Sequence, residues 1–143
     1  MEMANWLKRI KIRYVLLLAV FAAILFFALP ARPLSDPAEM EYLRVARSDG
    51  TSHESLELTG EQEAELRTLL SQTAFRRTLR GYSSDAATVS PFEIEVSLHY
   101  GQKPFHLPVR ADAGRCYSSS DDLIQYSAVN PEALLARLEE ILQ

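Results

Sequence analysis

The chain has 143 residues, of which 48% are apolar, 24% are charged and 12 are glycine or proline, and this composition excludes collagen-like, low-complexity and disordered proteins. The length accommodates one domain, and the formal net charge of −4 argues against a dedicated nucleic-acid-binding protein. The single cysteine excludes an intrachain disulfide framework and a metal site with several cysteine ligands.

Residues 14–31 predict a membrane-spanning helix, because these 18 residues include no charged side chain. At the helical rise of about 1.5 Å per residue, the segment spans about 27 Å, close to the hydrocarbon thickness of a bilayer. Residues 1–13 carry a net charge of +3, and the remaining 130 residues carry −7. The positive-inside rule therefore places the basic tail 1–13 in the cytoplasm and the C-terminal part of the chain outside the membrane.

A cleaved signal peptide is the alternative for this segment, since a charged start and an apolar stretch are typical of both. Cleavage after Ala31 would place Leu29, which is not a small residue, at the third position before the cut. We therefore favour an uncleaved signal anchor. The proline-containing residues 32–41 are interpreted as a short stiff linker, and residues 42–143 as an extracytoplasmic domain.

The first part of this domain predicts a hairpin and a helix. The alternation in residues 42–58 is interrupted by Asp49-Gly50, which is typical of a hairpin turn. Thr59 and Gln62 have capping-box spacing, so a helix is expected to begin there. Three cations follow the expected end of this helix: Arg76, Arg77 and Arg80. Residues 83–90 are interpreted as a polar loop.

Residues 92–100 and 105–111 alternate clearly and predict a second hairpin. A two-residue Gly101-Gln102 turn matches type II′ and places Val96 beside Leu107. A four-residue loop would shift every pair by two residues and leave the same faces together. Pro104 and Pro108 lack amide donors toward the far side, so we expect the second strand to be an edge strand or only partly covered.

Two further short strands are expected at 115–117 and 123–127, and Asn130-Pro131 is expected to begin a last helix. The element order after the membrane helix is then β-β-α-β-β-β-β-α. Tight turns between successive strands favour a mainly antiparallel sheet with both helices packed on its apolar face. The predicted fold class is α+β.

The arrangement resembles the small membrane-anchored extracytoplasmic domains of unknown function from Gram-positive bacteria. The resemblance extends over residues 42–142. It is carried by the N-terminal anchor, Asp49-Gly50, Thr59-x-x-Gln62, Phe92-x-Ile94-x-Val96, Tyr117, Tyr126 and Asn130-Pro131. It implies a location in the cell envelope, and no catalytic residue can be carried over from it.

Two groups of side chains could bind a ligand. His99 and His106 lie on the polar face of the second hairpin, directly opposite one another in the longer-loop register, and could share a metal with Glu95 as a third ligand. The alternative is a pair of partly exposed histidines. Arg76, Arg77 and Arg80 could hold a phospholipid headgroup or a polymer phosphate, because guanidinium groups match phosphate oxygens. The alternative is a set of cations that favour a helix C-terminus.

Other candidates have simpler interpretations. Cys116 could form an intermolecular disulfide, although a lone cysteine on a strand is more often a small buried residue. The run 118–122 is rich in oxygen ligands but lacks the spacing of a calcium-binding loop, which favours a solvated turn. No nucleophile with a neighbouring base and no glycine-rich phosphate loop is recognisable, so we expect neither an enzyme nor a cofactor.

The leading hypothesis is a single-pass membrane protein whose outer domain is a binding module for another envelope protein or polymer. One alternative is a membrane-tethered metal-binding or hydrolytic domain built around His99 and His106. Another is an accessory subunit whose transmembrane helix contacts the partner. We therefore expect two partners: the lipid bilayer, through residues 14–31, and an envelope protein or polymer. We do not expect a nucleic acid.

Overall fold

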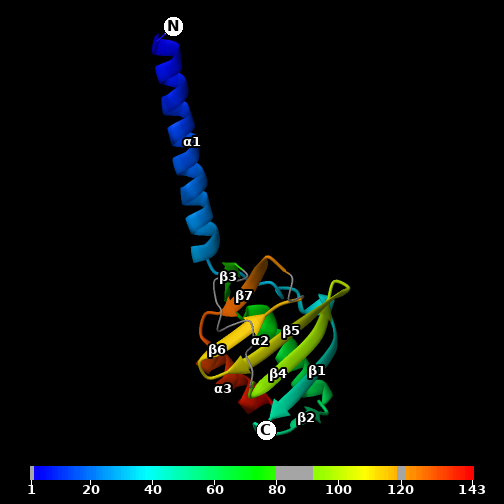
Figure 1. Cartoon of the computed structure of the whole chain (residues 1–143). Coiled ribbons are helices and arrows are strands. Elements are labelled where there is room, and N and C mark those ends of the chain that lie inside the picture. Colours follow the sequence, from blue (N-terminus) through cyan, green and yellow to red (C-terminus); the bar gives the residue numbers. More distant parts are fainter. Residues whose placement is uncertain (1, 80–91, 119–121) are drawn as a thin grey trace.

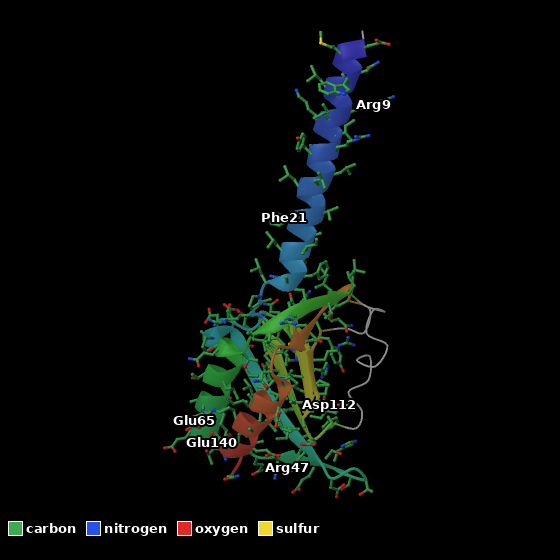
Figure 2. All side chains as sticks on the ribbon, turned by 90° about the vertical axis from the view of Figure 1, so that its left-hand side faces the viewer. Arg9, Phe21, Arg47, Glu65, Asp112 and Glu140 are labelled. Atoms are coloured by element: carbon green, nitrogen blue, oxygen red, sulfur yellow. The ribbon has the colours of Figure 1, made fainter. Side chains whose placement is uncertain are left out.

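A computed structural model describes residues 2–79, 92–118 and 122–143 of the chain. Helix α1 (Glu2–Ala28) stands apart from the remaining elements, and none of its residues is buried (Figure 1). It is long and apolar enough to span a membrane, with a mean hydropathy of 2.3 over 18 residues. Its side chains project outward on every side (Figure 2), as expected for a helix with no protein partner along most of its length.

Helix α1 differs from the expected span at both ends. It begins at Glu2, so the basic segment is helical as well. It ends at Ala28, because Pro30 has no amide hydrogen and disfavours the helical conformation of the preceding residue. Ala31 is already part of the domain, where it forms an antiparallel bridge with Phe75 through hydrogen bonds of 2.7 and 2.8 Å.

Residues 32–41 belong to the domain, which corrects the expectation of a detached linker. Leu34 and Met40 are buried in the hydrophobic core. Between them, the short 3-10 helix η1 (Pro37–Glu39) is capped by the Asp36 carboxylate, which accepts a hydrogen bond from the Ala38 amide. The prolines stiffen the segment as expected, but its two large apolar side chains anchor it to the core.

The domain is built around one antiparallel sheet with helices α2 and α3 on one face, which confirms the α+β fold class (Figure 1). Among the described residues the strands follow the order β2-β1-β4-β5-β6-β7-β3. Their bounds are β1 (Met40–Ser48), β2 (His53–Leu56), β3 (Phe75–Leu79), β4 (Ile94–Tyr100), β5 (Lys103–Arg110), β6 (Ala113–Cys116) and β7 (Ile124–Ala128). Helices α2 (Gly60–Gln72) and α3 (Pro131–Ile141) complete the fold.

Both helices begin as the sequence predicts. The Thr59 hydroxyl accepts a hydrogen bond from the Gln62 amide, and the Gln62 side chain accepts one from the Thr59 amide, so the capping box of α2 is complete. The Asn130 side chain caps α3, with Pro131 in its first turn. The two helices contribute five leucines to the core: Leu66, Leu70, Leu134, Leu135 and Leu138.

The β4–β5 hairpin has the register of the two-residue turn, with Val96 opposite Leu107. The turn itself differs from the expected type II′. Gly101 and Gln102 both have positive φ, at 55° and 72°, which is the conformation of a type I′ turn. Type I′ suits the right-handed twist of the strands equally well, so the register is unchanged.

Strand β5 is covered only in part on the side facing β6. It pairs with β6 at Val109 and Arg110, and His106 forms an isolated bridge with Tyr117. The pairing of β5 with β6 is interrupted between His106 and Val109, and this gap includes Pro108, which has no amide hydrogen to donate to β6. The expectation of a partly covered strand is therefore confirmed.

Strand β3 was not predicted, so the described part of the sheet has one strand more than expected. It pairs along its whole length with β7, from Phe75 opposite Ala128 to Leu79 opposite Ile124. The consecutive arginines 76 and 77 obscure its alternation, since only Phe75 and Leu79 are apolar. Cations are common on edge strands because they discourage pairing with other chains.

Candidate functional site

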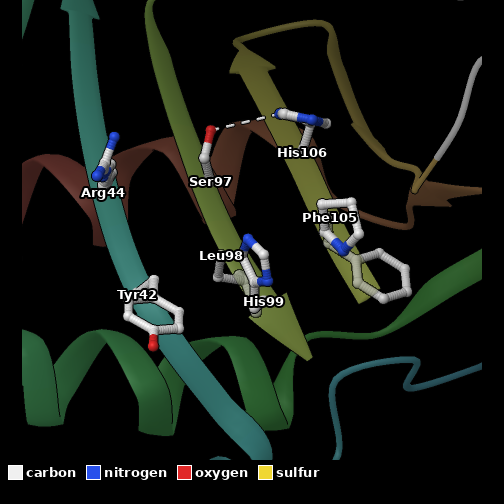
Figure 3. A pocket seen from close by; sticks show the side chains of 8 residues that line it. Tyr42, Arg44, Ser97, Leu98, His99, Phe105 and His106 are labelled. Carbon is white, nitrogen blue, oxygen red and sulfur yellow. Dashed lines mark hydrogen bonds between the residues drawn. The ribbon is translucent and has the colours of Figure 1, made fainter. Parts of the chain in front are cut away.

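The candidate site is a groove on the face of the sheet opposite helices α2 and α3. Alternation along β4 directs Ile94, Val96 and Leu98 into the core and leaves Ser97 and His99 on the other face. The groove has a volume of about 400 Å³ and lies over β1, β4 and β5 (Figure 3). Its lining residues are Tyr42, Arg44, Ser97, Leu98, His99, Pro104, Phe105 and His106.

Tyr42 occupies an unusual backbone position at this groove. Its φ of +55° lies in the left-handed region, and the register of β1 against β4 shifts between Glu41 and Arg44. A bulge of this kind re-aims a side chain, and the conformation costs on the order of 1–2 kcal/mol in a residue with a β carbon. The Tyr42 side chain is nevertheless 71% exposed, so no burial of its ring compensates for this cost.

The Tyr42 ring packs edge-to-face against His99, with centroids 5.4 Å apart. Arg44 lies further along β1 from Tyr42, where it is paired in register with Ser97 (Figure 3). The groove thus combines a cation with two exposed rings. Such a surface can contact an anionic group and an apolar or sugar face at the same time.

The second part of the groove is a weakly bonded set of polar side chains. His106 Nδ1 lies 3.4 Å from Ser97 Oγ and 3.7 Å from Glu95 Oε1, and Ser97 Oγ donates to Glu95 Oε1 at 3.4 Å. In a hydrolytic triad the acid orients the base through the ring nitrogen opposite the nucleophile. Here both neighbours face the same nitrogen, so this arrangement does not activate Ser97.

Tyr117 lies next to His106, to which it is bridged, and the centroids of the two rings are 5.5 Å apart. Burial raises the pKa of the Tyr117 phenol, and the Glu95 carboxylate raises it further, while Arg115 acts in the opposite direction. The phenol therefore remains protonated at neutral pH and is available as a hydrogen-bond donor on this face.

The structure places the two histidines on one face but not opposite one another. His99 is paired with Pro104, and His106 with Ser97, because the hairpin adopts the shorter turn. Within the described ranges, no group of three histidine, cysteine, aspartate or glutamate side chains could hold a metal ion. His106 Nδ1 lies 3.7 Å from the Glu95 carboxylate, which also accepts a hydrogen bond from Ser97, whereas the His99 ring packs against Tyr42.

Arg76 and Arg77 lie on β3 and not at the C-terminus of α2, which corrects their expected setting. Arg76 is exposed. Arg77 faces the end of α1, where its Nη1 donates to the Phe26 carbonyl at 3.2 Å and its guanidinium lies 4.4 Å from the centroid of the Phe26 ring. Arg80 lies outside the described residues.

Cys116 is fully buried on β6, as expected for a small apolar residue. Burial raises the pKa of its thiol to about 12. An accessible thiolate for an intermolecular disulfide is therefore not present in the folded domain. Of the oxygen-rich run, residues 119–121 lie outside the described part, and Asp122 accepts a hydrogen bond from the Ser118 amide at 3.3 Å.

The sequence reasoning missed the role of Tyr42, although a signal was present. Met40, Leu43 and Val45 are separated by three and then two residues, whereas a regular strand keeps a spacing of two on one face. A change of spacing within a strand indicates a bulge. The contact between Phe26 and Arg77 left no comparable signal, because the two residues are separated by 51 positions.

Comparison with known proteins yields no match to a protein-family model, to a curated protein or to a solved structure.

Proposed function

We propose that the chain is a single-pass membrane protein whose C-terminal domain is a binding module on the outer side of the membrane. The anchoring is supported by α1, which has an uncharged stretch with apolar side chains exposed on every side. The orientation is supported by the charges on the two sides of this stretch. Residues 1–13 carry a net charge of +3, whereas Arg32 is the only cation shortly after the stretch in sequence.

The binding role rests chiefly on Tyr42. A strained backbone that exposes a large aromatic ring favours a role other than stability. Because Arg44 and His99 line the same groove, it is suited to an acidic segment of another envelope protein or polymer that also presents an apolar or sugar face.

The anchoring is tested by alkaline carbonate extraction of membranes and by adding protease to cells stripped of their wall. The chain is expected to stay in the membrane fraction, and protease is expected to remove the domain while an N-terminal epitope survives. Loss of the epitope with a protected domain would reverse the orientation. Release of the chain by carbonate would exclude a spanning helix.

The groove is tested with a photo-crosslinking residue that keeps an aromatic ring in place of Tyr42, compared with the same residue in place of Glu65 on the exposed face of α2 (Figure 2). We expect a discrete adduct only from position 42, and we expect Arg44→Glu to weaken it. The same adducts from both positions, or an adduct unaffected by Arg44→Glu, would exclude the groove.

A swap of α1 for an unrelated membrane span separates this proposal from that of an accessory subunit that acts through its helix. The adduct from position 42 is expected to persist after the swap if the domain binds the partner. Its loss, with the domain still folded, would favour the helix as the contact.

A further inference from the structure

The uncharged part of α1 is shorter than the hydrocarbon layer of a bilayer. It runs from Tyr14 to Ala28, so its 15 residues extend over about 22 Å, against about 30 Å of hydrocarbon. In an anchored chain, lifting the end of α1 into water would draw Arg13 deeper into the hydrocarbon, which is costly. Phe26 therefore lies within the hydrocarbon layer or at its boundary with the headgroups, and not in the water beyond them.

Arg77 lies at the same depth as Phe26. Its guanidinium is 4.4 Å from the centroid of the Phe26 ring, and it donates a hydrogen bond to the Phe26 carbonyl. An arginine at this depth has its charge among the lipid headgroups. Strand β3 thus places the cation Arg77 at the domain end of the membrane span, although β3 is distant from the span in sequence. At the other end of the span the cation is Arg13.

Two more arginines are held at the same end of the domain. Only Leu29 and Pro30 separate α1 from the bridge between Ala31 and Phe75, so the domain has little freedom to swing away from the helix. Arg32 and Arg76 directly follow the two bridge residues, and both are exposed. Alternation along β3 directs Arg76 to the opposite side of the strand from Arg77.

We infer that Arg32 and Arg76 bind the phosphate groups of anionic phospholipids, while Arg77 positions this end of the domain against α1. The inference rests on the proposed membrane anchoring. Guanidinium groups bind phosphate oxygens with two parallel hydrogen bonds, and headgroups are the phosphates found at this depth. Residues 14–143 carry a net charge of −7, so the attraction depends on these arginines and not on the domain as a whole.

The test uses the full chain in vesicles of phosphatidylcholine, with or without one third phosphatidylglycerol, that contain a lipid with a nitroxide quencher on its headgroup. A fluorophore is attached to Gln72→Cys, at the end of α2 that precedes β3, or to Glu54→Cys on β2 at the far end of the domain (Figure 1). Cys116 is buried and stays unlabelled.

We expect quenching of the label at position 72 to increase with phosphatidylglycerol, while the label at position 54 changes little. Arg32→Glu with Arg76→Glu should weaken the affinity of this end of the domain for phosphatidylglycerol headgroups, and hence the added quenching, by about fivefold for each cation lost. The matched control is Arg47→Glu with Arg137→Glu, which makes the same change in net charge at exposed positions elsewhere. A high salt concentration should also reduce the added quenching at position 72, because it screens the attraction between the arginines and the headgroups.

The outcomes separate this inference from the anchoring on which it rests. Extraction of the chain from the vesicles by carbonate would overturn both. A chain that resists extraction, but whose label at position 72 ignores phosphatidylglycerol or the two arginines, would overturn the headgroup contact alone. Because the vesicles contain no other polymer, a positive result identifies the lipid as the source of the phosphate.

Discussion

The side-chain amide of Gln62 donates a hydrogen bond to the carbonyl of Ile141, with 3.0 Å between Nε2 and the oxygen. Gln62 lies in the first turn of α2, and Ile141 is the last residue of α3. The same side chain accepts the hydrogen bond of the Thr59 amide through Oε1. One residue therefore satisfies backbone groups at the start of one helix and at the end of the other.

Gln62→Ala is expected to lower the free energy of unfolding by about 1–2 kcal/mol, because it removes both hydrogen bonds. Gln62→Glu should lose less, since a carboxylate still accepts from Thr59 but cannot donate to Ile141. Urea unfolding followed by circular dichroism measures the difference. Gln72→Ala, at an exposed position at the other end of α2, is the control. Equal losses for the two Gln62 variants would leave the hydrogen bond to Ile141 as the only contribution, because Gln62→Glu retains the capping bond.

Arg77→Ala is expected to loosen the connection between α1 and the domain. The change removes a hydrogen bond to the Phe26 carbonyl and a contact with the Phe26 ring, together about 1 kcal/mol. Amide exchange at Leu29 and Ala31 should therefore accelerate about fivefold in bilayers. Arg76→Ala, on the same strand, should leave this exchange unchanged, and equal acceleration by both variants would contradict the specific role of Arg77.

The buried Cys116 predicts a loss of stability at alkaline pH. Burial raises the pKa of its thiol from 9.0 to about 12 in the folded chain. Between these values the unfolded chain has released the proton and the folded chain retains it. Unfolding is thus favoured by about 1.4 kcal/mol for each pH unit above 9, whereas the contribution is constant below 9.

Cys116→Ala isolates this effect from other groups that titrate in the same range, such as Tyr117. The variant should unfold more easily than the wild type at pH 7, by about 1 kcal/mol for the lost sulfur contacts. The two proteins should converge as the pH rises, measured by urea unfolding at successive pH values. Parallel curves over the alkaline range would show that the thiol is not the group responsible.

Local signals were sufficient for much of the fold. The capping box at Thr59, the asparagine cap at Asn130 and the alternation of β4 each depend on residues close in sequence, and each predicted element is present. Strand β3 was missed because its stability comes from pairing with the distant strand β7, from Phe75 opposite Ala128 to Leu79 opposite Ile124. Contacts between distant segments leave little trace in either segment alone.

The candidate site was predictable in part. Alternation in the second hairpin placed His99 and His106 on the outer face, where both line the groove. Arg44 and Tyr42 reach the groove only because β1 pairs with β4, an adjacency that the expected order of hairpins does not contain. The proximity of Arg32 to Arg76 depends on the bridge between Ala31 and Phe75, which brings the segment after α1 to strand β3.

Substitution of Tyr42 separates the stability of the domain from its proposed binding role. Glycine adopts a φ of +55° without strain, so Tyr42→Gly should be more stable than Tyr42→Ala by about 1 kcal/mol in urea unfolding. Both variants lack the ring that packs against His99, so both should lose the Arg44-dependent binding of the partner. A stabilised variant that no longer binds would indicate that the strained tyrosine is retained for recognition. Equal stability of the glycine and alanine variants would show that the bulge relaxes once the ring is removed, and that the exposed ring, and not the backbone, determines this conformation.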